Sequence, residues 1–180
     1  MRQRDLETLF DFSYWVRDRV LAQAAKLSVA DFCTPSGVTI RGLRETLVHT
    51  LDVEWSWRLR LQGAPEDVWK KELVPEDYAT VAALADHWRQ DEREMRSWLA
   101  GLDDERLERI HQLTPTTAAD RSRRAVEHPL WYYVMHIHTH THQQLSDASV
   151  ILTRMRQSPG NIEFLEYAEH ANRRAATPAD

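Results

Sequence analysis

Four long segments of the chain repeat apolar residues every three or four positions, and this period constrains the fold more than any other feature. It is the period of an α-helix with one buried face, whereas a half-buried strand would alternate apolar and polar residues. Strand patterns are weak throughout. In the first segment the repeat runs through Leu6, Leu9, Ser13, Val16, Val20, Ala24 and Leu27. We therefore predict an all-α protein.

The second and third segments end at residues that typically start or stop helices. The second is predicted to span residues 40–63, because Thr39 can cap its start and Gly63 suits the position just after its end. The third is predicted to span residues 80–102. Each is long enough to cross a small domain.

The last part of the chain begins with its least regular stretch, residues 103–129, for which we expect a short helix and a loop. Pro129 can open a helix, since its missing N–H costs nothing there. The fourth long helix is therefore predicted at residues 130–155. After "SPGN", the stretch "IEFLEYAEH" predicts a short extra C-terminal helix.

Four long helices joined by loops of moderate length predict a four-helix bundle. At 180 residues the chain is long enough for one well-packed domain. We assign residues 1–170 to a single helical-bundle domain and expect residues 171–180 to be a disordered tail.

Charge and hydropathy exclude several classes of protein. The net charge of −5, without a run of lysine and arginine, gives no sign of nucleic-acid binding. No stretch approaches the ~18 apolar residues of a membrane span, and the charged N-terminal pattern predicts a helix rather than a signal peptide. With one cysteine, Cys33, no internal disulfide is expected. A cytoplasmic protein is the expectation.

The stretch "VMHIHTHTHQQLSDAS" carries histidines at four alternate positions. A strand would place all four on one face, but the flanking apolar residues keep the helical period. On a helix the histidines form two i,i+4 pairs, and the side that carries His136 and His140 also carries Gln144. The pairs are His136 with His140, and His138 with His142.

A histidine pair at i,i+4 can bind one metal ion at ~2.0–2.1 Å from each nitrogen. The alternative is that these are polar residues beside a buried stripe. Successive alternate positions differ by ~200° on a helix, so we expect one pair to face His49 of the second helix and the other to face solvent or a partner. Asp52 and Glu54 could orient a metal-bound His49.

Three stretches resemble the DinB-like (DinB/YfiT) superfamily of bacterial four-helix proteins, and together they cover most of the chain. "FDFSYWVRDRVL" is similar to the family's first helix and "IRGLRETLVHTLDVEWSWRLRLQG" to its second. "PLWYYVMHIHTHTHQQLSDASVILTRMRQSPGNIEFLEYA" resembles its fourth helix and C-terminal ending. The resemblance implies a metal site of three histidines, one on the second helix and an i,i+4 pair on the fourth.

His49 matches the first of these ligands. Alignment on "LW" and on "SPGN" places the other two at His140 and Gln144, so the chain departs from the family pattern at one ligand. Gln144 could bind through its amide oxygen, or His136 could supply the third nitrogen.

Two further alternatives remain for the site. The ligands could have shifted to His138 and His142, which together with His49 restores three imidazoles. The site could also be degenerate and hold no metal.

The resemblance implies a divalent-metal enzyme, with zinc or nickel as the metal. Its activity would be that of a thiol S-transferase, using a low-molecular-weight thiol such as mycothiol or bacillithiol, or that of a hydrolase, in either case on a small-molecule substrate. It also implies a homodimer, which the seven tryptophans favour because aromatic residues are enriched at interfaces. The alternative is a non-catalytic, stress-linked helical protein that binds a partner or dimerises.

Overall fold

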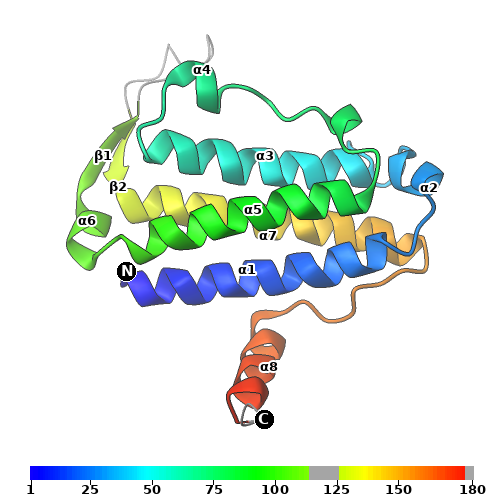
Figure 1. Ribbon diagram of the computed structural model, residues 1–180. Helices are drawn as coiled ribbons and strands as arrows, with labels where there is room; N and C mark the ends of the chain where they lie inside the picture. The colour runs from blue at the N-terminus through cyan, green and yellow to red at the C-terminus, as the bar shows by residue number, and fades with distance from the viewer. Residues whose placement is uncertain (114–125, 177–180) are drawn as a thin grey trace.

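The computed structural model describes residues 1–113 and 126–176, and it confirms the all-α bundle. Four long helices run alongside one another, and α7 packs against both α3 and α1 (Figure 1). None of the helices in these two ranges has the length and apolar character needed to cross a membrane. The long helices are α1 (Gln3–Ala24), α3 (Leu43–Leu61), α5 (Val81–Ala100) and α7 (Leu130–Arg154).

Short elements join the long helices and extend the chain beyond them. A two-stranded antiparallel sheet and α6 lie at one end of the bundle, α2 lies at the other end, and α8 projects away from it (Figure 1). The sheet lies in the region predicted as irregular, where no strand was expected. The short elements are α2 (Val29–Cys33), α4 (Glu66–Trp69), the 3-10 helix η1 (Pro75–Asp77), α6 (Asp104–Glu108), β1 (Ile110–Leu113), β2 (Val126–Pro129) and α8 (Phe164–Ala176).

The predicted end of the second long helix is confirmed, but its predicted start is wrong. Gly63 follows the end of α3 with a φ of 81°, a conformation that glycine adopts easily. The helix begins at Leu43, after Gly42, rather than near Ile40. The Thr39 hydroxyl, expected to cap the helix, instead donates to the backbone oxygen of Arg41 at 2.6 Å. This turn keeps Ile40 almost wholly exposed.

The other helix ends follow the expected signals more closely. The Thr80 side chain accepts a hydrogen bond from the backbone N–H of Ala83 and caps α5, and α7 begins directly after Pro129. The last helix is longer than predicted, since α8 continues to Ala176. Residues 171–176 are therefore helical rather than part of the predicted tail, and residues 177–180 lie outside the described residues.

The core consists of two apolar clusters, one toward each end of the bundle. Buried polar side chains occupy the middle. The Glu54 carboxylate of α3 accepts hydrogen bonds from the Tyr14 hydroxyl of α1 at 2.7 Å and from the Trp88 indole N–H of α5 at 3.1 Å. One helical turn away, Arg58 donates to Asp91 through Nε at 3.1 Å. Buried carboxylates need such partners, because removal from water is otherwise costly.

Burial changes the protonation of Glu54. Removal from water and, after it, the nearby Asp91 raise the pKa of its carboxyl from 4.5 to about 7, although the hydrogen bonds from Tyr14 and Trp88 oppose the shift. Glu54 therefore takes up a proton on folding between pH 4.5 and about 7. Its contribution to stability is complete below the unfolded pKa and is lost as pH rises through the folded pKa.

We expect Glu54→Gln to remove this pH dependence, because the amide imitates the protonated carboxyl and can still bond to Tyr14 and Trp88. Urea unfolding of both proteins should show the wild type losing stability relative to the variant by up to ~1.4 kcal/mol per pH unit within that window. Taking the difference cancels the contribution of the histidines. Exposed Glu94→Gln serves as the control. A constant difference between wild type and Glu54→Gln would contradict the assignment.

Candidate functional site

The alternating histidines of α7 lie on two sides of the helix, as predicted, because α7 is packed between α3 and α1. The ring of His140 lies 5.1 Å from that of His49 on α3, and the ring of His136 lies 6.2 Å from that of His140. The other pair faces α1, where the rings of His138 and His142 lie 6.3 Å and 5.2 Å from that of Phe12. The four histidines therefore do not form one cluster.

The side of α7 that faces α3 gathers the residues predicted as metal ligands. His49 and His140 are half-buried, His136 is exposed, and Gln144 is buried one turn beyond His140. The rings of His49 and His140 meet edge to face, with an interplanar angle of 77°. A helix pair in contact thus brings one imidazole from α3 and two from α7 to the same surface.

The site keeps its imidazoles neutral. Burial, followed by the neighbouring His49, His136 and Arg41, lowers the pKa of His140 to about 4. Burial also lowers the pKa of His49, as does Arg41, whereas Glu72 opposes the shift. Neutral imidazole is the form that binds a metal, since the ligating nitrogen needs its lone pair.

The chemistry of this group fits a metal, although the geometry is incomplete. Two imidazoles on one tetrahedral ion place their ring centres ~5 Å apart, given metal–nitrogen distances of ~2.0–2.1 Å, and His49 and His140 meet this separation. His140 Nδ1 is buried and has no hydrogen-bond partner in the described part of the chain. Within residues 1–113 and 126–176, however, no three His, Cys, Asp or Glu side chains are grouped closely enough to hold an ion.

Among the described residues, no third ligand is in position beside His49 and His140. His136 lies one turn from His140 at the surface, where its ring rests 4.9 Å from that of Trp57. Gln144 lies one turn on the other side and offers an amide oxygen. Either side chain would have to turn toward His49 and His140 to complete the set.

The prediction that the pair formed by His138 and His142 faces solvent or a partner is wrong, because both rings pack against Phe12 of α1. His138 is buried, and its Nδ1 lies 2.8 Å from the Ser13 hydroxyl of α1. Burial, followed by the neighbouring His142, lowers the pKa of His138 to about 4. Because α1 covers this side of α7, a shift of the ligands to this pair would move them away from His49.

Asp52 and Glu54 do not orient His49 in the described structure. Asp52 accepts a hydrogen bond from the backbone N–H of Leu73 at 2.8 Å, and Glu54 points into the core. Sequence inspection also missed Arg41, which precedes α3 and acts on both His49 and His140. The position of Arg41 near these two histidines depends on the start of α3 at Leu43, which the sequence did not predict.

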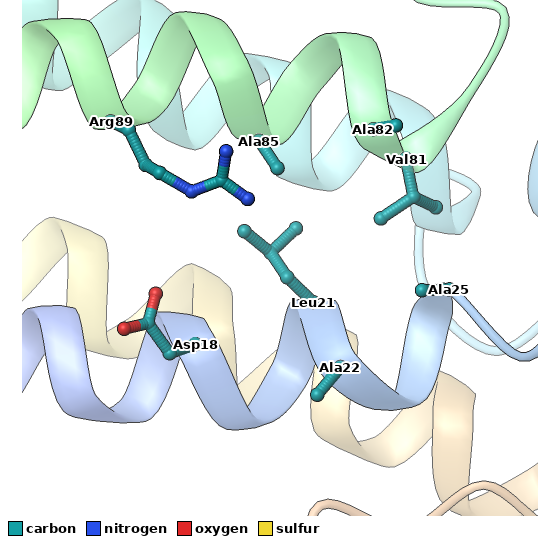
Figure 2. A pocket seen from close by; sticks show the side chains of 8 residues that line it. All are labelled: Asp18, Leu21, Ala22, Ala25, Val81, Ala82, Ala85 and Arg89. Atoms are coloured by element: carbon teal, nitrogen blue, oxygen red, sulfur yellow. The ribbon is translucent and has the colours of Figure 1, made fainter.

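A groove between α1 and α5 lies apart from the histidines (Figure 2). Asp18 of α1 and Arg89 of α5 lie on its opposite walls, and the other lining residues are small or apolar. The groove has a single carboxylate and no histidine or cysteine among its lining residues, so it offers no metal-ligand set. Those lining residues are Asp18, Leu21, Ala22, Ala25, Val81, Ala82, Ala85 and Arg89.

We expect Ser13→Ala to destabilise the fold by about 1–3 kcal/mol, because it leaves the buried His138 Nδ1 without its partner. Ser146→Ala is the matched control, since the Ser146 hydroxyl donates only to the backbone oxygen of His142, at 2.9 Å. Its cost should stay within about 0.5 kcal/mol. Urea unfolding measures both, and equal costs would argue against a structural role for His138.

Comparison with known proteins agrees with the architecture. The model of the DinB family matches residues 1–175, which is almost the whole chain. A search of curated proteins finds no match. Since the match spans all four long helices and most of α8, the chain belongs to the DinB family.

Proposed function

We propose that the protein is a divalent-metal-dependent enzyme in which His49 and His140 hold zinc or nickel. The observation that carries this proposal is the pair of neutral imidazoles from α3 and α7, with ring centres 5.1 Å apart. His136 or Gln144 would complete the ligand set. A small-molecule substrate would enter from the exposed side, where His136 lies.

The proposed reaction is S-transfer from a low-molecular-weight thiol of the mycothiol or bacillithiol type, or hydrolysis. A bound divalent ion would supply Lewis acidity, which favours a thiolate at neutral pH and activates the nucleophile in hydrolysis. Residues of the protein would prepare the site for the thiolate. The low pKa of His140 keeps protons from competing for its lone pair, and the positive charge of Arg41 acts on both ligating histidines.

A second candidate is a non-catalytic, stress-linked helical binding or dimerising protein with a degenerate site. Gln144 favours it, because a neutral amide oxygen is a weaker donor to zinc or nickel than imidazole. A cytoplasmic location is part of both proposals. Metal binding distinguishes them.

We expect wild type to bind one zinc or nickel ion per chain, and His49→Ala and His140→Ala to abolish binding because each leaves too few strong ligands. His142→Ala is the matched control, since it removes a histidine of the same helix that faces α1. Its affinity should stay close to that of the wild type. Calorimetric titration of purified, metal-free proteins gives the result. Absence of binding by the wild type would favour the degenerate site.

We expect Gln144→His to strengthen metal binding, because it supplies the imidazole that the family pattern carries at this position. Removal of a group that only orients a metal ligand typically costs about 10–100-fold in affinity, so an added ligand should raise affinity by at least about tenfold. Competition with a chromophoric chelator measures the change. Gln143→His, at the exposed neighbouring position, is the control. A variant no tighter than the wild type would argue that position 144 does not reach the metal.

We also propose a homodimer, on the basis of the seven tryptophans and the exposed apolar residues Phe164 and Leu165 of α8. Light scattering at micromolar concentration should give about twice the chain mass of 21.1 kDa. Leu165→Glu, which places a charge on the exposed face of α8, should shift the protein toward the monomer. A monomeric wild type would contradict the proposal.

A further inference from the structure

Two histidines outside the proposed metal site lie opposite one another on the small sheet at the end of the bundle (Figure 1). In the antiparallel pairing of β1 with β2, His111 is the direct partner of His128. Directly opposite residues of an antiparallel pair point to the same face of the sheet, with Cβ atoms ~4.5–5.5 Å apart. The two imidazoles therefore leave the backbone side by side.

The hydrogen-bond pattern of the sheet supports this spacing. The N–H of Leu130 donates to the backbone oxygen of Arg109 at 3.0 Å, directly beside the end of the sheet. Hydrogen-bonded and non-hydrogen-bonded positions alternate along an antiparallel pair. His111 and His128 lie two residues along each strand from that bond and so occupy a hydrogen-bonded position, where Cα atoms are ~5.5 Å apart. Pro129, which has no N–H, falls at the other kind of position, as this register requires.

Both histidine rings contact the same tyrosine of α7. The ring of Tyr133 lies 6.1 Å from that of His111 and 5.9 Å from that of His128. The neighbouring Tyr132 ring stacks on His128 at 5.2 Å, with an interplanar angle of 19°. The Tyr133 hydroxyl donates to the backbone oxygen of His111 at 3.1 Å and so fastens β1 to α7. The start of α7 thus keeps both histidines on one side of the sheet.

The two imidazoles are accessible from water and are open to a ligand. Both histidines are half-buried. Within residues 1–113 and 126–176, neither ring takes part in a hydrogen bond or an ion pair. Burial, followed by the positive charge of Arg60, lowers the pKa of His111. Neutral imidazole is the form that binds a metal, because the ligating nitrogen needs its lone pair.

We propose that His111 and His128 form a second binding site for a divalent transition-metal ion, with one nitrogen from each imidazole and water at the remaining positions. Imidazole suits zinc, nickel and copper, and affinity in this series is highest for Cu²⁺. Cu²⁺ also takes a square arrangement of nitrogen and oxygen ligands, which two adjacent imidazoles and waters can supply. The site does not rest on the proposed function, because it shares no ligand with His49 and His140.

Rotation of the two side chains is enough to form this site. Metal–nitrogen distances of ~2.0–2.1 Å hold the two ligating nitrogens ~3 Å apart. Side chains whose Cβ atoms are ~4.5–5.5 Å apart therefore need to converge by only ~2 Å. The χ2 torsion of histidine has broad minima, so each ring can turn from its tyrosine toward the other histidine while the strands stay paired.

The second ion would lie too far from the proposed catalytic ion to act with it as a pair. Tyr133, which both rings contact, precedes His140 by seven residues, or ~10 Å along α7 at ~1.5 Å per residue. Paired catalytic ions lie ~3.5–4 Å apart. An ion between His111 and His128 would instead join β1 to β2 beside the start of α7. It would stabilise the sheet, because it binds only the paired strands.

The test removes the proposed catalytic site first, so that only the second site is observed. Full-length His140→Ala is titrated with Cu²⁺ by calorimetry, and the bound ion is examined by electron paramagnetic resonance. One ion per chain should bind, with hyperfine coupling to two nitrogens. Adding His111→Ala or His128→Ala should weaken binding at least about tenfold, since two ligands held on one scaffold bind far more tightly than either alone.

Two controls separate this pair from the other histidines. Adding His170→Ala removes a half-buried histidine of α8 and should leave Cu²⁺ binding as in His140→Ala. Gln112 lies on the opposite, exposed face of β1. Adding Gln112→His to the protein that lacks His111 restores the number of histidines but should not restore binding. Failure of the zinc and nickel titrations alone contradicts the proposed function, and failure of the Cu²⁺ titrations alone contradicts the second site.

Three results would overturn the proposal. They are absence of Cu²⁺ binding by His140→Ala, unchanged affinity when His111 or His128 is also replaced, and recovery of binding with Gln112→His. If the variants of the pair do not fold, NMR of His140→Ala decides, because bound Cu²⁺ broadens the signals of nearby nuclei. Broadening centred on the ring of Tyr133 supports the site, and broadening that spares this ring rejects it.

Discussion

The hydrogen bonds to the buried Glu54 carboxylate hold three of the four long helices in register. Tyr14 of α1 and Trp88 of α5 both donate to this one side chain of α3. A buried carboxylate without those donors would be costly. A shift of α1 or α5 along α3 would therefore lose a hydrogen bond to Glu54 as well as apolar contacts. The polar layer stands between two apolar clusters that would tolerate sliding more easily.

The register fixed by Glu54 also decides which residues of α3 face α7. With Glu54 turned into the core, His49 and Trp57 lie on the side of α3 that meets α7, where they contact His140 and His136. The fourth helix is held on its other side by the contact between His138 and Ser13. The alternating histidines therefore serve two purposes, since one pair packs α7 against α1 and the other lines the candidate site.

Sequence periodicity predicted the bundle because each long helix buries one face, and local signals such as Gly63 and Pro129 predicted ends that depend on the backbone alone. Prediction from the sequence failed where an element depends on tertiary contacts. The start of α3 is set by a turn at Arg41, and the sheet is set by pairing of residues far apart in the chain. The family register placed His136, His140 and Gln144 together on one side of α7. It could not show that α1 covers the other side, nor that Trp69 of α4 packs against Arg60 of α3.

The meeting line of two antiparallel helices also explains why the candidate site is long rather than compact. Along α3, Trp57 lies eight residues beyond His49. On α7, its partner His136 lies one turn nearer the start of the helix than His140, the partner of His49. On the proposed function, a metal would lie at one point of this line, and the stacked rings of Trp57 and Tyr133 extend the line toward the end of α3.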